Sequence, residues 1–194
     1  MKGARVLSSQ EVFAGRAWRL RVEKVKEPGG VVATREIVAH NGSVVVLPVF
    51  EDGSVLMVRQ YRHAAKQFLW ELVAGHLEPG EKPADAGPRE LEEEAGYTAR
   101  HWRPLLDFFP SPGLSTERMW VWLATGLKRG TARPEEDERI TARRFSLDAV
   151  ESMIRRGELH DAKTIASILF YARFTREKDV QAKTRRRKGV SGRP

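Results

Sequence analysis

An acid-rich stretch at residues 75–97, GHLEPGEKPADAGPRELEEEAGY, constrains this chain more than any other segment. It begins with a glycine turn and an acidic loop, and it continues into a predicted helix that carries Glu90, Glu93 and Glu94. Residues three and four apart lie on one face of a helix, so these carboxylates are expected to lie together. They would repel one another without a cation among them. A hard divalent cation such as Mg²⁺ is the candidate, since it is typically held by one or two carboxylates plus substrate phosphates.

The fixed positions of this stretch follow one spacing. Gly75 is followed by five residues and Glu81, then by seven residues, Arg89-Glu90-Leu91, one residue, Glu93-Glu94, one residue and Gly96. This spacing resembles the Nudix box of the Nudix hydrolases. Every fixed polar or glycine position of that motif is filled, and Tyr97 stands where the family more often has an aliphatic residue. A solvated acidic helix face is the alternative for the acids alone, and the other fixed residues argue against it.

The resemblance implies a role for each fixed residue. Glu90 and Glu94, one helical turn apart, would bind the metal together with the backbone carbonyl of Ala74. Glu93 would ligate a second ion or hold a water. Structural roles are implied for the remaining fixed residues, which are Gly75, Glu81, Arg89 and Gly96. Arg89 is expected to pair with one of the neighbouring acids, Glu81 or Glu93. The expected metal is Mg²⁺, with Mn²⁺ as an alternative.

Hydrolysis of a diphosphate is the reaction expected of such a site. Mg²⁺ would bridge diphosphate oxygens, offset their charge and lower the pKa of a bound water, and a carboxylate would take the proton. In many members of the family this base lies on a loop after the box. Glu138, followed by Glu136, is predicted here from the acid cluster 135–138, although such a cluster can also be a solvated loop. Glu117 and Glu93 are the alternatives.

Segments outside the box resemble the ADP-ribose pyrophosphatase branch of the family. The resemblance covers about residues 12–172 and rests on Gln60-Tyr61-Arg62, Leu69-Trp70-Glu71-Leu72, Ser111-Pro112-Gly113 and Asp161-Ala162-Lys163-Thr164-Ile165. It implies Mg²⁺-dependent hydrolysis of ADP-ribose to AMP and ribose 5-phosphate. The alternative within the family is hydrolysis of GDP-mannose or another nucleoside-diphosphate sugar. A non-catalytic nucleotide sensor and an RNA pyrophosphohydrolase that uses the basic tail are alternatives of other classes.

Residues outside the box are predicted to bind the substrate. Arg62 could bind phosphate or stack on adenine with its planar guanidinium, or it is a surface arginine at a strand end. Trp18 could stack on adenine or pack in the core. In the ADP-ribose pyrophosphatase branch, N-terminal strands supply an aromatic residue to the nucleobase site, often across a dimer. The full predicted set is Trp18, Arg35, Glu36, Arg62 and Gly113, with His40 near it and His63 and His76 expected to be structural or exposed.

The pattern of apolar residues and turns predicts a mixed α and β fold. Residues 16–25 and 31–39 flank a Pro-Gly-Gly turn and are expected to form a hairpin. The expected helices are 85–95, 146–156 and 161–175, and further strands are expected at 43–50, 55–58, 68–73, 102–109, 119–125 and 140–145. The first helix is expected to have Asp85 as its N-cap, because Gly87 and Pro88 are unfavourable in a helix interior. The order predicts an α/β (α+β) fold, and the resemblance implies a Nudix-type α/β/α sandwich.

Three parts of the chain are expected. They are an N-terminal β extension at 1–42 for dimerisation and nucleobase binding, a Nudix hydrolase domain at 43–175, and a basic, disordered tail at 176–194. The ADP-ribose pyrophosphatase branch implies a homodimer with exchanged N-terminal strands.

Composition and charge narrow the partners. Six of the eight net positive charges lie in residues 176–194, so nucleic acid is not the expected partner of the site. The chain has no cysteine, which excludes disulfides and thiol catalysis. No apolar run reaches the ~20 residues of a membrane span, and the N-terminus lacks the apolar core of a signal peptide. We therefore expect a cytoplasmic protein that acts on a small-molecule nucleoside-diphosphate sugar.

Overall fold

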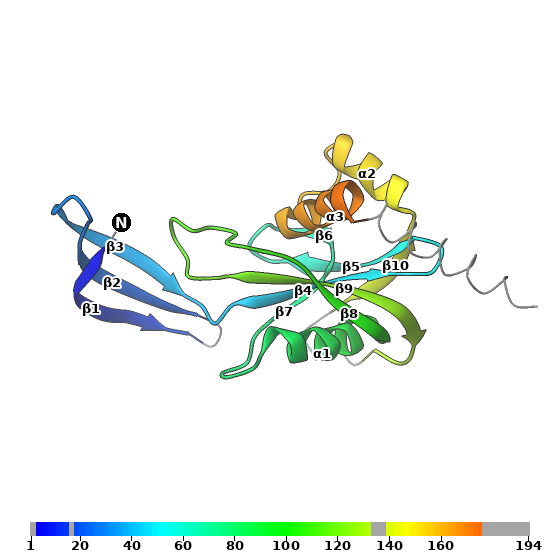
Figure 1. Ribbon diagram of the computed structural model, residues 1–194, viewed down its shortest axis with the longest axis horizontal. Coiled ribbons are helices and arrows are strands. Elements are labelled where there is room, and N and C mark those ends of the chain that lie inside the picture. Colours follow the sequence, from blue (N-terminus) through cyan, green and yellow to red (C-terminus); the bar gives the residue numbers. More distant parts are fainter. Residues whose placement is uncertain (1–2, 16–17, 133–138, 176–194) are drawn as a thin grey trace, which may run out of the picture.

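The structure is a computed structural model that describes residues 3–15, 18–132 and 139–175. The described residues form two β-sheets and three helices (Figure 1). Their elements in chain order are β1 (Arg5–Ala14), β2 (Arg19–Lys26), β3 (Val32–Ala39), β4 (Ser43–Val49), β5 (Val55–Arg62), β6 (Gln67–Glu71), β7 (Val73–His76), α1 (Pro83–Ala95), β8 (Tyr97–Phe108), β9 (Met119–Arg129), β10 (Thr141–Phe145), α2 (Leu147–Arg155) and α3 (Ala162–Phe174).

The larger sheet is mixed and lies between two layers of helices. Its strands follow the order β10-β5-β4-β9-β8, with β6 paired to β5 and β7 paired to β4. The central pair β4 and β9 is parallel, and the other pairs are antiparallel. Helix α1 covers one face, and α2 and α3 cover the other (Figure 1). The predicted α/β/α sandwich with a mixed sheet is therefore confirmed.

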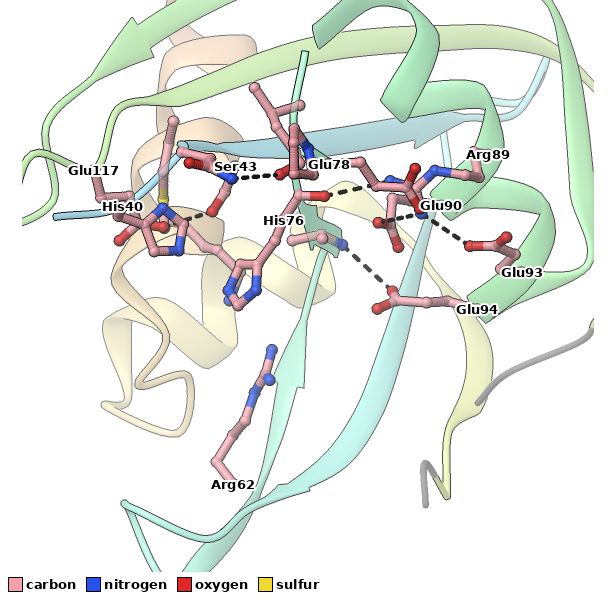
Figure 2. Close-up of a pocket in the computed structure, with 17 residues that line it drawn as sticks. His40, Ser43, Arg62, His76, Glu78, Arg89, Glu90, Glu93, Glu94 and Glu117 are labelled. Carbon is pink, nitrogen blue, oxygen red and sulfur yellow. Dashed lines mark hydrogen bonds and ion pairs between the residues drawn. The ribbon is translucent and has the colours of Figure 1, made fainter. Parts of the chain in front are cut away.

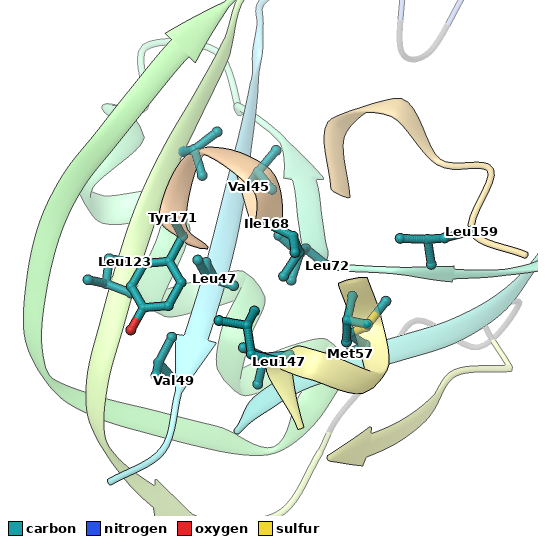
Figure 3. Packing of buried hydrophobic residues seen from close by; sticks show 13 residues of the cluster. Val45, Leu47, Val49, Met57, Leu72, Leu123, Leu147, Leu159, Ile168 and Tyr171 are labelled. Atoms are coloured by element: carbon teal, nitrogen blue, oxygen red, sulfur yellow. The ribbon is translucent and has the colours of Figure 1, made fainter. Parts of the chain in front are cut away.

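Strand β4 is the centre of the core, and all of its residues are buried. Side chains of a strand alternate between the two faces. Val45, Leu47 and Val49 pack with side chains of α2 and α3, including Leu147 and Ile168 (Figure 3). The intervening Val44 and Val46 belong to the clusters on the α1 side, with Ala86 and Leu91 respectively. One strand thus joins both apolar layers.

Pro48 lies in this central strand at a change of partner. The antiparallel register of β4 runs with β7 through Val46↔Val73, and it resumes with β5 at Val49↔Val55. On its other side Pro48 is in the parallel register with Ala124. Proline has no amide hydrogen to give to a ladder. The change from β7 to β5 therefore supplies the interrupted position that a proline in a central strand needs.

Helix α1 begins earlier than expected. The prediction of Asp85 as N-cap is wrong, because the helix starts at Pro83 after Lys82 and contains both Gly87 and Pro88. Pro83 suits the first position, where no intrahelical amide bond is lost. Pro88 lies on the exposed face of the helix. Water can therefore hydrate the carbonyl four residues earlier, to which an amide at position 88 would otherwise donate. Gly87 is buried, and a Cβ there would lie 3.2 Å from the Trp102 ring, so a close packing contact explains it.

The other helix boundaries match expectation. Gly96 ends α1 with φ +67°, a left-handed conformation that glycine adopts readily. The Ser146 side chain accepts a hydrogen bond from the Ala149 amide at 3.2 Å, and Asp161 accepts one from the Thr164 amide at 3.1 Å. Both predicted N-caps are confirmed. None of the helices in the described ranges is long and apolar enough to cross a bilayer.

The N-terminal sheet has three strands rather than two. The predicted hairpin is β2 and β3, and β1 adds an outer antiparallel strand that the sequence patterns did not indicate. Figure 1 shows this sheet beside the sandwich rather than packed on it. It meets the loop after β8, where the Val38 amide donates to the Leu114 carbonyl and the Thr116 amide to the Val38 carbonyl, each near 3 Å (2.9 and 3.0 Å).

Exposed apolar side chains are a feature of this N-terminal sheet. Trp18 precedes β2 and is exposed, with its ring centroid 5.2 Å from that of Phe13, so it does not pack in the core. The other exposed large apolar residues of this region are Val6, Leu7, Val12, Phe13, Val31 and Val32. Such a surface is typical of a region that packs against a partner.

Candidate active site

A cavity of about 680 Å³ lies beside the face of α1 that carries its glutamates. Strand β7, the loop before β4 and the N-terminus of α3 complete its wall. Figure 2 shows the acids of α1 on one side of this cavity and Arg62 reaching toward it from β5. Its lining residues come from distant parts of the chain and are His40, Asn41, Ser43, Arg62, Ala74, Gly75, His76, Leu77, Glu78, Pro79, Arg89, Glu90, Glu93, Glu94, Glu117, Met119 and Lys163.

Arg89 is the cation among the acids of α1. Its Nε and Nη2 donate to the two oxygens of Glu81, both at 3.0 Å. Its Nη1 donates to Glu90 at 2.8 Å and to Glu93 at 3.0 Å. These bonds, above all those with Glu81, raise the pKa of Arg89, and they lower the pKa of Glu81. Arg89 therefore contacts both acids expected for it and holds the box loop against the helix.

Glu90 and Glu94 lie against the backbone of β7. They are only 8% and 6% exposed, and the Ala74 amide donates to Glu94 Oε2 at 3.3 Å. A Cβ on Gly75 would lie 1.8 Å from Glu90 Oε1, so only glycine leaves room for that carboxylate. The spacing of the box thus brings two carboxylates to residues 74 and 75 at the cavity.

This donor set fits a magnesium-type ion bound through oxygen. Within the described ranges, no three His, Cys, Asp or Glu side chains form a ready cluster for a metal. Two carboxylates and a carbonyl leave the remaining positions of an octahedral ion to water and to phosphate oxygens, which is how Mg²⁺ is commonly held. Glu93 is more exposed than Glu90 and pairs with Arg89 at the cavity edge.

Arg62 and Glu71 form a two-bond ion pair beside the cavity. The Nε and Nη2 of Arg62 donate to the two Glu71 oxygens, both at 2.7 Å. Burial raises the pKa of Glu71, but the bonds from Arg62 and Lys163 outweigh it and the net pKa is lowered. The pKa of Arg62 is raised, first by Glu71 and further by Glu94. Arg62 is therefore an anchored cation that lines the cavity, not a loose surface arginine.

Two histidines and Glu117 close another side of the cavity. The rings of His40 and His76 meet edge to face with centroids 4.7 Å apart. The Gly42 amide donates to His40 Nδ1 at 2.8 Å, and the Ser43 hydroxyl donates to Glu117 at 2.6 Å. Burial, followed by His40, lowers the pKa of His76. Glu117, a secondary candidate for the base, thus lies in the site.

Four predicted substrate contacts lie away from this cavity within one chain. Arg35 pairs with Glu27 on the N-terminal sheet, and Glu36 is exposed on the same strand. Trp18 and Gly113 are also exposed and are not among the lining residues. The predicted bases Glu138 and Glu136, like the tail at 176–194, lie outside the described residues.

Sequence reasoning missed several lining residues. His76 was expected to be structural or exposed, and Asn41, Ser43, Glu78 and Lys163 were given no role. His76 directly follows the box glycine in β7, and Lys163 lies two residues after a helix cap. These positions give a usable signal only once the neighbouring strands and helix are placed in space.

Comparison with known proteins identifies the architecture. The model of the NUDIX domain matches residues 39–168. An ADP-ribose pyrophosphatase of Bacillus subtilis is 36% identical over 86% of this chain and 91% of its own length. A methanol dehydrogenase activator of Bacillus methanolicus is 34% identical over the same shares.

An ADP-ribose pyrophosphatase of Mycobacterium tuberculosis is 39% identical over 84% of this chain and 80% of its own. A crystal structure described as an ADP compounds hydrolase shares the fold, with a TM-score of 0.80 at 19% identity over 92% of this chain and 97% of that one.

Substitution of Gly75 tests whether the position of the Glu90 carboxylate matters. Gly75→Ala is expected to push that carboxylate aside and to weaken Mn²⁺ binding about 10- to 100-fold, the range seen when groups that orient metal ligands are lost. The free Mn²⁺ signal in electron paramagnetic resonance measures this binding. Gly29→Ala, in a turn where a Cβ meets nothing within 4 Å, is the matched control and should bind like wild type. Equal Mn²⁺ affinity of a folded Gly75→Ala variant would contradict the assignment.

Proposed function

Because the chain belongs to the NUDIX family, we propose that it hydrolyses the pyrophosphate of ADP-ribose to AMP and ribose 5-phosphate. The observation that carries the proposal is the mixed lining of one cavity, in which Glu90 and Glu94 lie apart from Arg62 (Figure 2) and Lys163 also forms part of the wall. Such a cavity suits a diphosphate that is neutralised by a metal and by fixed cations. The names of the relatives from Bacillus subtilis and Mycobacterium tuberculosis support ADP-ribose as the substrate.

The residues of the site have distinct tasks in this proposal. A bound Mg²⁺, or Mn²⁺, at Glu90, Glu94 and the Ala74 carbonyl would offset phosphate charge and make a bound water more acidic. Arg89 holds Glu90 in place. Arg62 keeps two of its five N–H donors on Glu71 and has others for phosphate oxygens. Hydrolysis forms a P–O bond to the water oxygen, breaks the bridging P–O bond, and delivers the water proton to a carboxylate.

The identity of this carboxylate base is a separate proposal. Glu138, with Glu136 second, is retained as the base because many members of the family place it on a loop after the box. Glu117 is the rival favoured by a specific observation, since it lines the cavity beside Ser43. Glu93 is a weaker rival because it is committed to Arg89.

Substrate recognition outside the diphosphate is proposed to need a second chain. The four residues predicted to bind the nucleobase or its surroundings do not reach the cavity of their own chain. Exposed apolar side chains cover the N-terminal sheet, which supports packing against another copy. We therefore propose a homodimer with exchanged N-terminal strands that brings Trp18, Arg35, Glu36 and Gly113 to a composite site, acting in the cytoplasm.

A panel of nucleotides tests the activity. With Mg²⁺, wild type should release phosphatase-sensitive products from ADP-ribose with a higher kcat/KM than from GDP-mannose or UDP-glucose. Glu94→Gln keeps the shape of the side chain but removes its charge, and it should reduce turnover at least about 100-fold. Chelation of the metal should have the same effect. A better kcat/KM for GDP-mannose would move the assignment to the alternative, and nucleotide binding without turnover would favour a sensor.

Paired substitutions locate the base. Glu138→Gln should lower kcat about 100- to 10,000-fold, the usual contribution of a positioned base, while Mn²⁺ binding stays near the wild-type value. Glu117→Gln keeps a hydrogen-bond acceptor for Ser43 and should lower kcat far less. The opposite ranking of the two variants would assign the base to Glu117.

Light scattering during gel filtration measures the oligomeric state. The protein should elute with twice the mass of the 22.0 kDa chain. Phe13→Glu, on the exposed surface of β1, should shift the protein toward monomer because it places a charge in the proposed contact. Ser8→Glu, at an exposed polar position of the same strand, is the control for the effect of an added charge on the oligomeric state. A wild-type monomer at assay concentration would exclude the composite site.

A further inference from the structure

Lys163 is an almost buried cation in the wall of the cavity that also holds the acids of α1. It is 9% exposed and lines the cavity together with Arg62. Its ammonium donates to Glu71 Oε2 at 2.5 Å and to Asp161 Oδ1 at 2.8 Å. Glu71 has no exposed surface and also receives both bonds of Arg62. The two cations therefore share one fully buried carboxylate.

The backbone around Lys163 is fixed by bonds that do not need its charge. Asp161 accepts from the Thr164 amide and hydroxyl as the N-cap of α3. The Thr164 hydroxyl oxygen accepts from the Leu72 amide at 2.7 Å, which ties α3 to the junction of β6 and β7. A cap and this cross-link would hold with an uncharged residue at position 163.

The charge of Lys163 is unfavourable on local grounds. Position 163 is in the first turn of α3, at the positive end of the helix dipole, where cations are disfavoured. Burial of an ammonium adds a desolvation cost. Glu71 already has a two-bond partner in Arg62, so it does not require a second cation to be paired. Stability of the fold alone thus gives a weak reason for a lysine here.

The cavity supplies a stronger reason. An ammonium has three N–H donors, and the contacts of Lys163 to the described residues use two of them, on Glu71 and Asp161. Neither of these two acids is among the residues that line the cavity, whereas Arg62 and Lys163 both are. The cationic groups of Arg62 and Lys163 are therefore the ones presented to the cavity.

We propose that Lys163 is a phosphate-binding residue that acts with Arg62 on the same phosphate group of the substrate. Its third N–H donates to a phosphate oxygen, and Glu71, which accepts from both Arg62 and Lys163, keeps the two cations at a fixed spacing. The inference rests on the proposed function, since it takes the diphosphate to lie in this cavity. Two donors on one phosphate, one from β5 and one from α3, would fix the orientation of the phosphate as well as offset its charge.

Calorimetric titration with ADP in Mg²⁺ buffer separates binding from a structural role. Lys163→Met keeps the length of the stem but removes the ammonium, and it should raise the Kd of ADP and the KM of ADP-ribose about tenfold or more, with a smaller change in kcat. Lys163→Arg should restore part of the affinity. Ser167→Ala is the matched control because it removes a buried hydrogen bond of α3 to the Lys163 carbonyl but keeps the lysine charge and both of its acid partners, and its Kd should stay within about threefold of wild type.

A folded Lys163→Met variant, judged by its melting temperature, that binds ADP like wild type would overturn the proposal. An equal rise in Kd for Lys163→Met and Ser167→Ala would also overturn it, because it would mean that only the packing of α3 matters.

Footprinting of wild type with an amine-directed acetylating reagent covers the case in which the variant does not fold. ADP should protect Lys163 from acetylation, as measured by mass spectrometry, whereas adenosine, which has no phosphate, should not. Equal protection by both, or by neither, would contradict the proposal. If wild type binds ADP in this way but fails to hydrolyse ADP-ribose, the substrate assignment falls and the phosphate-binding role of Lys163 stands.

Discussion

The guanidinium of Arg89 holds together parts of the chain that would otherwise repel or drift apart. It bonds Glu81 in the loop, Glu90 and Glu93 on α1, and the His76 carbonyl at the end of β7. A planar fork of five donors can satisfy several acceptors at set angles, which a lysine ammonium cannot do. The loop, helix and strand of the box therefore adopt one arrangement, and the acid side of the cavity depends on it.

The part of the site that could be predicted from the sequence is the part made by local spacing. Glu90, Glu94 and Gly75 lie within twenty residues of one another, so the turn length and the helix period nearly determine their contact. The same holds for the caps at Ser146 and Asp161, where each acceptor lies three residues before its donor. Apolar runs bounded by turn residues likewise predicted most of the strands of the mixed sheet.

The rest depends on contacts between distant segments, for which the sequence carries no local pattern. Lys163 and Glu71 are 92 positions apart and meet only because α3 packs over the end of β6. Helix α1 starts before Asp85 although it contains Gly87, and Gly87 packs closely on Trp102 of β8, a tertiary contact that local propensity does not report. Strand β1 has no buried residue in the chain, so no apolar periodicity marked it.

In the proposed diphosphate site, Glu71 has a consequence for the energetics of the reaction. In water, cations must first be brought together around a diphosphate. The solvent around them must then reorient as charge develops during the reaction. Here Arg62 and Lys163 are already aligned by a carboxylate with no solvent contact. That reorganisation is completed when the chain folds, and fixed charges of this kind need little rearrangement as a bond breaks. A carboxylate that never touches solvent can therefore lower the barrier of a reaction in which it takes no direct part.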